Sequence, residues 1–164
     1  TDIIVILCAV VVALEAGAQA GDDSSRIPAA DRGLAAVTAA GVALVFFGSV
    51  AESARDGGTV PVPWFAAGVA VALVGAALRA RSIHVLGRGF VTPARPVARE
   101  RCVHDVYAYM RHPSEVGLLA CLAGVALASR ATSAGLGLAT AAVASLVRVK
   151  REGRYLRARY PSSS

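Results

Sequence analysis

Apolar positions along this chain form five long blocks separated by short polar stretches. The blocks hold 14 to 18 residues each and cover residues 3–18, 33–50, 62–78, 116–129 and 131–147. A helix needs about 20 residues to cross a bilayer core, with about 17 as the practical minimum. Each block alone would fit the core of a soluble helical protein. Five together, with the charges confined between them, predict an integral membrane protein.

The predicted fold is therefore all-α, a bundle of five transmembrane helices in a single membrane domain of residues 1–164. Residues 1–60 hold the first two helices, and residues 61–164 hold the other three. The break between these parts is "ESARDGGTVPVP", whose Gly-Gly pair and two prolines end a helix. The first two helices are expected at about 3–19 and 33–51.

The last three helices are expected to begin near Trp64, at Pro113 and near Ala131. Tryptophan suits a membrane interface, and proline suits the first turn of a helix. The third helix is expected to run past Arg79. Only "SRATS" joins the last two apolar blocks, so these two helices must form an antiparallel hairpin. Both are rich in small residues, which let membrane helices approach closely.

The composition also indicates a membrane protein. Hydrophobic residues make up 55% of the chain and charged residues only 17%, whereas about a quarter of a soluble domain is charged. The first block follows Thr1 and Asp2 rather than a basic start, so it is interpreted as a retained helix and not as a signal peptide. The three cysteines (Cys8, Cys102 and Cys121) lack metal-ligand spacing, and no metal site or disulfide is predicted.

The net charge of +6 is placed unevenly. Seven arginines lie within residues 79–112, six basic residues within 148–159 and two within 20–32, whereas the two remaining connections carry one each. With five spans, the three basic segments share one side of the membrane, and the positive-inside rule makes that side cytoplasmic. We therefore expect the N-terminus outside and the C-terminus in the cytoplasm, in the inner or plasma membrane of a bacterium. This placement argues against nucleic acid as a partner and favours membrane lipids.

The segment "YAYMRHPSEVG", residues 107–117, places charged groups at the start of the fourth predicted helix. Because Pro113 suits the first turn, Arg111 and His112 stand just before a helix N-terminus. Free N–H groups and the helix dipole favour anions there. The three residues predict either a receptor for a carboxylate or phosphate, or an anchor to lipid headgroups. By themselves they do not decide between the two.

The basic tail "RVKREGRYLRARY", residues 148–160, follows the fifth apolar block. If it is helical, Arg148, Glu152 and Arg159 lie on one face. Glu152 is the only acid of this tail. It is either a functional carboxylate or one half of an ordinary salt bridge with Arg148, which would be worth a few tenths of a kcal/mol.

Together, "VYAYMRHPSEVG" and "RVKREGRYLRARY" resemble the isoprenylcysteine carboxyl methyltransferase family and its phospholipid methyltransferase relatives, which are integral membrane enzymes. The family pattern is an aromatic residue, Arg-His-Pro, one residue, Tyr, an apolar residue and Gly. A helical hairpin follows, and then a basic helix with a Glu-Glu pair. The upstream "ALRARSIHVLGRGF" is also similar to the family. The resemblance covers about residues 75–160.

The resemblance implies methyl transfer from S-adenosylmethionine at the cytoplasmic membrane face, with S-adenosylhomocysteine as the product. It makes residues 61–164 the catalytic core. The cofactor pocket would be formed by the loop between the third and fourth helices, the start of the fourth helix and the C-terminal helix. The substrate would be an isoprenoid-like or lipid-like molecule, methylated on a carboxylate. Arg111 and Glu152 would be catalytic, and the cofactor pocket would include Tyr107, Tyr109, His112, Pro113 and Arg148.

Three features depart from the family pattern. Glu115 stands where the family has tyrosine, Gly153 replaces the second acid of the Glu-Glu pair, and the tail is short. Glu115 either has a catalytic role, paired with Arg111 or with a substrate donor, or is an acid favoured by the helix dipole, worth under about 1 kcal/mol. We assign Glu115 to the catalytic set. Because Gly153 replaces the second acid, an alternative is a family member that keeps the helix bundle but no longer catalyses methyl transfer.

Glu15, in the first predicted helix, indicates a different class of protein. An ionisable residue within a span is a functional candidate, although near a helix end it can also reach headgroup water. Short Ala- and Gly-rich helices with one acid are typical of small proton-coupled transporters. A transporter predicts that Glu15→Gln abolishes function and that Arg111→Ala does not, and a methyltransferase predicts the reverse.

Overall fold

The computed structural model describes residues 29–55, 60–86, 105–110 and 112–159, and all its regular elements are helices. They are α2 (Ala29–Arg55), α3 (Val62–Leu86), α4 (Val106–Tyr109), α5 (Pro113–Ser129) and α6 (Thr132–Arg159). The predicted all-α class is therefore confirmed for this part of the chain. The first predicted helix, with Glu15, lies outside the described residues, so the count of five spans stays a prediction.

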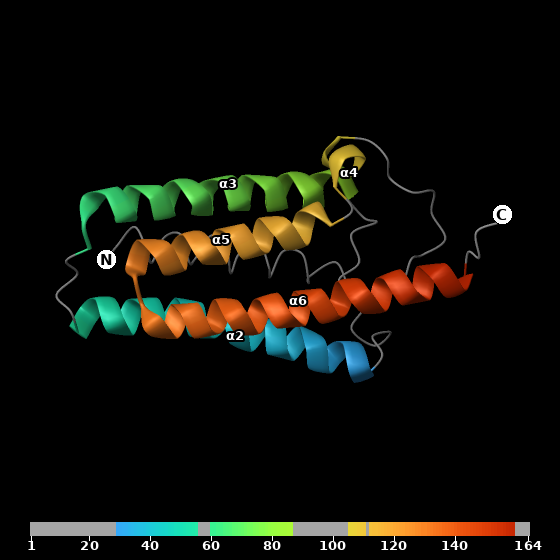
Figure 1. The fold of residues 1–164 in the computed structure, drawn as a ribbon, viewed down its shortest axis with the longest axis horizontal. Coiled ribbons are helices and arrows are strands. Elements are labelled where there is room, and N and C mark those ends of the chain that lie inside the picture. The colour runs from blue at the N-terminus through green and yellow to red at the C-terminus, as the bar shows by residue number, and fades with distance from the viewer. Residues whose placement is uncertain (1–28, 56–59, 87–104, 111, 160–164) are drawn as a thin grey trace.

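Within these ranges, α2, α3 and α6 are long and apolar enough to cross a membrane. Helix α5 is also apolar but has only 17 residues, or about 25 Å at 1.5 Å per residue. It is also the helix that is surrounded most completely. It contacts α3 on one side and both α2 and α6 on the other, and Figure 1 shows it between these neighbours.

Glycines bring the backbones of α3 and α5 almost into contact. A Cβ atom at Gly124 would lie 2.3 Å from the backbone nitrogen of Ala72, and one at Gly68 would lie 2.4 Å from that of Ala128. The pairing of early α3 residues with late α5 residues makes the two helices antiparallel. In a membrane, close approach of this kind replaces apolar burial as the source of helix association.

Glycines of α5 and α6 pack against helices outside the hairpin. Those of α5 face α3, and Gly137 of α6 faces α2, where an added Cβ would lie 2.6 Å from the carbonyl oxygen of Gly41. Helices α5 and α6 are antiparallel neighbours, as expected, but each makes its closest approach to an earlier helix. The reason is that each helix places its glycines on the face that turns away from the other member of the hairpin.

Side-chain sizes are distributed differently from those in a soluble protein, although large apolar residues such as Leu118 and Leu122 are also buried. Many buried positions carry small residues, namely Ala72, Ala128, Ala134, Ala141, Ala144, Ser49, Ser82 and Ser129. Large apolar side chains are exposed instead, among them Val37, Leu44, Phe47, Leu73, Val74, Leu136, Val143 and Leu146. Soluble domains bury such residues. The arrangement fits helices whose outer faces contact lipid, and it supports an integral membrane protein.

The helix ends extend beyond the apolar blocks. Helix α2 continues to Arg55, past the expected end at about 51, and α3 runs past Arg79 to Leu86, as predicted. Helix α6 continues through the basic tail to Arg159, because arginine, lysine, leucine and glutamate are good helix formers. Only Arg130 and Ala131 separate α5 from α6.

Candidate active site

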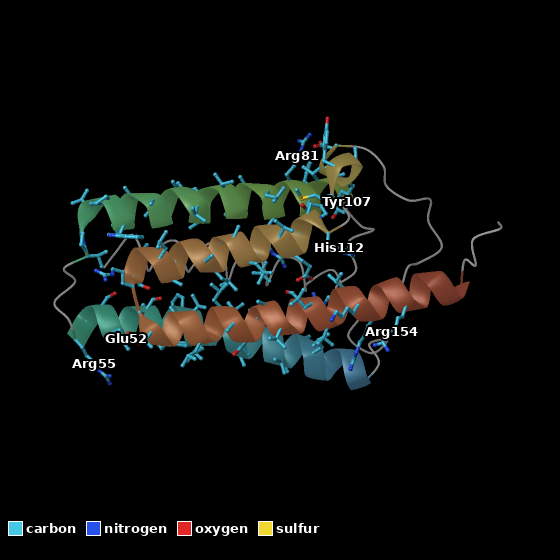
Figure 2. The ribbon with its side chains drawn as sticks, viewed as in Figure 1. Glu52, Arg55, Arg81, Tyr107, His112 and Arg154 are labelled. Atoms are coloured by element: carbon cyan, nitrogen blue, oxygen red, sulfur yellow. The ribbon has the colours of Figure 1, made fainter. Side chains whose placement is uncertain are left out.

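The start of α5 and the basic half of α6 lie at the same end of the bundle. Figure 2 shows Tyr107 and His112 beside the C-terminal end of α3, with Arg154 on α6 at that end. Glu52 and Arg55 lie at the opposite end. The α3–α5–α6 order of antiparallel helices produces this arrangement, and it brings together the two segments that carry the candidate residues.

Helix α5 begins as the sequence predicts. Pro113 is its first residue and is buried, and His112 is the N-cap, with φ −134° and ψ 58°. The first helical hydrogen bond runs from the Val116 N–H to the carbonyl oxygen of His112, at 3.2 Å. The side chain of His112 forms no cap hydrogen bond. It is half-buried, and it remains a candidate for ligand binding.

Glu115 joins α5 to α6. Its Oε1 accepts a hydrogen bond from Nη1 of Arg148 at 2.7 Å, and its Oε2 accepts one from the Ser145 hydroxyl at 2.6 Å. The Glu115 and Arg148 side chains are only 14% and 18% exposed. Charge-assisted hydrogen bonds between partly buried groups are stronger than those between exposed ones. Arg111, which we considered as the partner of Glu115, lies outside the described residues.

Arg79 joins α5 to α3 from the opposite side. Its side chain is buried, and its Nη1 donates to the carbonyl oxygen of Ser114 at 2.9 Å and to the Ser114 hydroxyl at 2.7 Å. It also lies close enough to Glu115 to interact with that carboxylate electrostatically. From the sequence, Arg79 was counted with the basic connection after the third apolar block, although the third helix was expected to run past it. Its contact with Ser114 was not predicted.

The short helix α4 is tied to α3 by an ion pair. Arg81 donates a hydrogen bond to Oδ2 of Asp105, the residue before α4, whose φ of 58° is unusual for a non-glycine residue. This contact places α4 over the end of α3. Tyr107 is half-buried there, whereas Tyr109 is 90% exposed. Asp105 was not among the residues selected from the sequence.

The basic tail forms the last part of the site. Arg148 lies on α6 and binds Glu115; its pairing with Glu152 stays a prediction. Glu152 belongs to the same helix one turn later, but its side chain lies outside what the structure describes, as does Arg111. The proximity of these two residues therefore stays a prediction. Lys150, Arg151 and Arg154 are exposed.

Polar contacts at the opposite end of the bundle have a structural role. Glu52 of α2 accepts hydrogen bonds from the backbone N–H groups of Thr132 and Ser133 at 2.8 and 2.9 Å, and from the Ser133 hydroxyl. It thus caps the N-terminus of α6, where N–H groups lack partners within the helix. The sequence analysis did not identify this cap. Among the described residues, no cluster of His, Cys, Asp and Glu has the form of a metal site.

The fold and this polar end define a class: a membrane-embedded helix bundle with a basic, hydrogen-bonded site at one end. A model of the phospholipid methyltransferase family matches residues 63–163, which include α4, α5, α6 and all of α3 except Val62. The chain belongs to that family. Comparisons with curated proteins and with solved structures give no match. The family makes the protein a membrane methyltransferase and confirms the resemblance seen in the sequence.

Proposed function

We propose that the protein transfers a methyl group from S-adenosylmethionine to the carboxylate of a lipophilic, isoprenoid-like or lipid-like molecule at the cytoplasmic face of the membrane. The observation that carries the proposal is the contact between Glu115 and Arg148. It holds the Arg-His-Pro turn and the basic tail, the two segments that resemble this class of methyltransferase, at one end of the bundle.

The described residues fit the cofactor chemically. Its amino acid part carries a carboxylate, which suits Arg148, His112 and the α5 N-terminus that follows Pro113. Its adenine ring suits an aromatic side chain, and Tyr107 and Tyr109 of α4 lie at this end. We assign these five residues to the cofactor site. When bound, S-adenosylmethionine supplies an electrophilic methyl group.

Arg111 and Glu152 are the proposed catalytic residues, with Glu115 beside them. A carboxylate acceptor is already a nucleophile and needs orientation rather than a base. A guanidinium fork such as that of Arg111 orients a carboxylate through two parallel hydrogen bonds. For a hydroxyl or amine acceptor, Glu152 would take the proton. Both oxygens of Glu115 already accept hydrogen bonds from α6, which supports a role in placing Arg148 within the site.

The charges support one orientation in the membrane. Arg148, Lys150 and Arg151 belong to the same part of α6 as Arg154, which lies at the proposed active end. Arg55 lies at the opposite end, where the link that contains Arg130 joins α5 to α6. The positive-inside rule makes the first end cytoplasmic, where S-adenosylmethionine is found. We therefore propose that the C-terminus is cytoplasmic. The lipid-facing side chains of α3 and α6 support a substrate that reaches the site from the bilayer.

The family match favours this class over the transporter that Glu15 had indicated. The test is a transfer assay with S-adenosylmethionine carrying a radioactive methyl group, using an isoprenoid carboxylic acid as one acceptor and phosphatidylethanolamine as the other. Methyl esters release volatile methanol in base, whereas N-methyl groups do not. Base-labile label on the isoprenoid acid supports the proposal. Label that is incorporated into phosphatidylethanolamine and is not released as methanol in base would show that the acceptor is an amine and not a carboxylate. An Arg55→Ala variant, changed at the far end, serves as the active control.

A further inference from the structure

We infer that Arg79 is a positioning residue, which holds the Arg-His-Pro turn in its working orientation by binding the residue that follows it. The inference rests on the proposed function in assigning that turn to the cofactor site. It concerns a residue of the upstream segment "ALRARSIHVLGRGF", outside the two motifs that hold the proposed catalytic and cofactor-binding residues.

The first observation is burial. Arg79 lies within a helix that can span a membrane, and only 4% of it is exposed. A charged group placed within a span is costly, and such residues are retained chiefly where they serve function. Arg81, two residues later on the same helix, has a side chain that is 58% exposed and binds Asp105. The two arginines therefore serve different purposes.

The second observation is what Arg79 binds. One nitrogen, Nη1, donates to both the backbone carbonyl and the hydroxyl of Ser114, and Ser114 follows Pro113 directly. A bond to the backbone fixes the path of the chain and not only a side chain. Arginine can form this contact because Gly117 lets α3 come close: a Cβ there would lie 2.7 Å from the backbone nitrogen of Arg79.

The third observation is that adjacent residues bind in opposite directions. Ser114 binds Arg79 of α3, and Glu115 binds Arg148 of α6. The first turn of α5 is thereby held from two sides, which sets both its rotation about the helix axis and its height in the bundle. His112, the N-cap residue, inherits that placement. Small displacements of a positioned group reduce catalysis strongly.

Hydrogen–deuterium exchange tests this role without reference to activity. In Arg79→Gln, exchange of the first hydrogen-bonded α5 amides, in peptides covering residues 112–119, should rise about tenfold, because loss of an anchoring contact favours local opening. Peptides from α2 and from the N-terminal half of α6 should not change. In residues 112–119, the exchange rate of Arg79→Lys should lie between those of the wild type and Arg79→Gln. Arg55→Gln should exchange at the wild-type rate. Unchanged exchange in residues 112–119 of Arg79→Gln overturns the inference.

Binding of S-adenosylhomocysteine supplies the second readout. We expect the Kd to rise about tenfold in Arg79→Gln and less in Ser114→Ala, which keeps the backbone carbonyl acceptor. The double variant should bind about as weakly as Arg79→Gln alone, because both changes remove the same contact. If the rise in Kd in the double variant equals the product of the rises in the two single variants, the inference is overturned. Ser114→Ala also provides a test if Arg79→Gln does not fold. If the wild type binds no S-adenosylhomocysteine, the proposed function fails, and the exchange experiment still decides the role of Arg79.

Discussion

Glu115 of α5 and Arg148 of α6 form an ion pair with a 2.7 Å hydrogen bond, at a site where both side chains are largely buried. The residues are far apart in sequence, and each lies in a segment that resembles the same class of methyltransferase. Their contact brings the two motifs together at one end of the bundle. It also gives Glu115, which departs from the family's tyrosine, a defined partner on α6.

The ion pair predicts coupled effects of mutation. Glu115→Ala and Arg148→Ala should each lower the free energy of unfolding by about 1–3 kcal/mol, because each leaves a partly buried charge without its partner. The double variant Glu115→Ala/Arg148→Ala should lose less than the sum of the two, with a coupling of about 1 kcal/mol or more. Thermal unfolding in detergent measures all three. Additive losses would show that the contact contributes nothing.

The close approach of α3 and α5 predicts opposite outcomes at two glycines. Gly124→Ala should lower Tm, because the new Cβ would lie 2.3 Å from the backbone nitrogen of Ala72 and force the helices apart. Gly135→Ala is the matched control on α6, where an added Cβ meets nothing within 4 Å. That change should leave Tm unchanged or raise it, because reduced backbone entropy of the unfolded chain adds about 0.4–1 kcal/mol to the free energy of unfolding. Equal changes in Tm in the two variants would contradict the close packing of α3 against α5.

The cap at the far end predicts a loss of stability without a loss of ligand binding. Glu52→Ala removes the acceptor for the Thr132 and Ser133 N–H groups and should destabilise the protein by about 1 kcal/mol. Because Glu52 lies at the end opposite α4, the Kd for S-adenosylhomocysteine should stay within a factor of about two of wild type. A large change in that Kd would mean that the two ends of the bundle are coupled.

Local signals made much of the fold predictable from sequence. The apolar blocks place α2, α3, α5 and α6, and Pro113 marks the first residue of α5, because proline preferences act within one turn. The helix-forming residues of the tail predict that α6 continues beyond its apolar part. The helix ends differ because α2 runs on to Arg55 through residues that favour helix without being apolar.

The contacts between side chains of different helices were not predictable from the sequence. The burial of Arg79, the ion pair of Glu115 and the cap by Glu52 depend on which helix faces are in contact. Those faces are set by glycines such as Gly68 and Gly124 through close backbone approach, a packing choice that no single segment reveals. The sequence identified Glu115 and Arg148 as candidates but did not identify them as partners.

Calorimetric titration of the detergent-purified protein with S-adenosylhomocysteine is the decisive test of a cofactor site at this end of the bundle. We expect saturable binding heat at a protein concentration on the order of tens of micromolar. We also expect Glu152→Gln to retain binding while turnover is lost. Absence of binding heat in the folded wild-type protein would contradict a cofactor site at this end of the bundle.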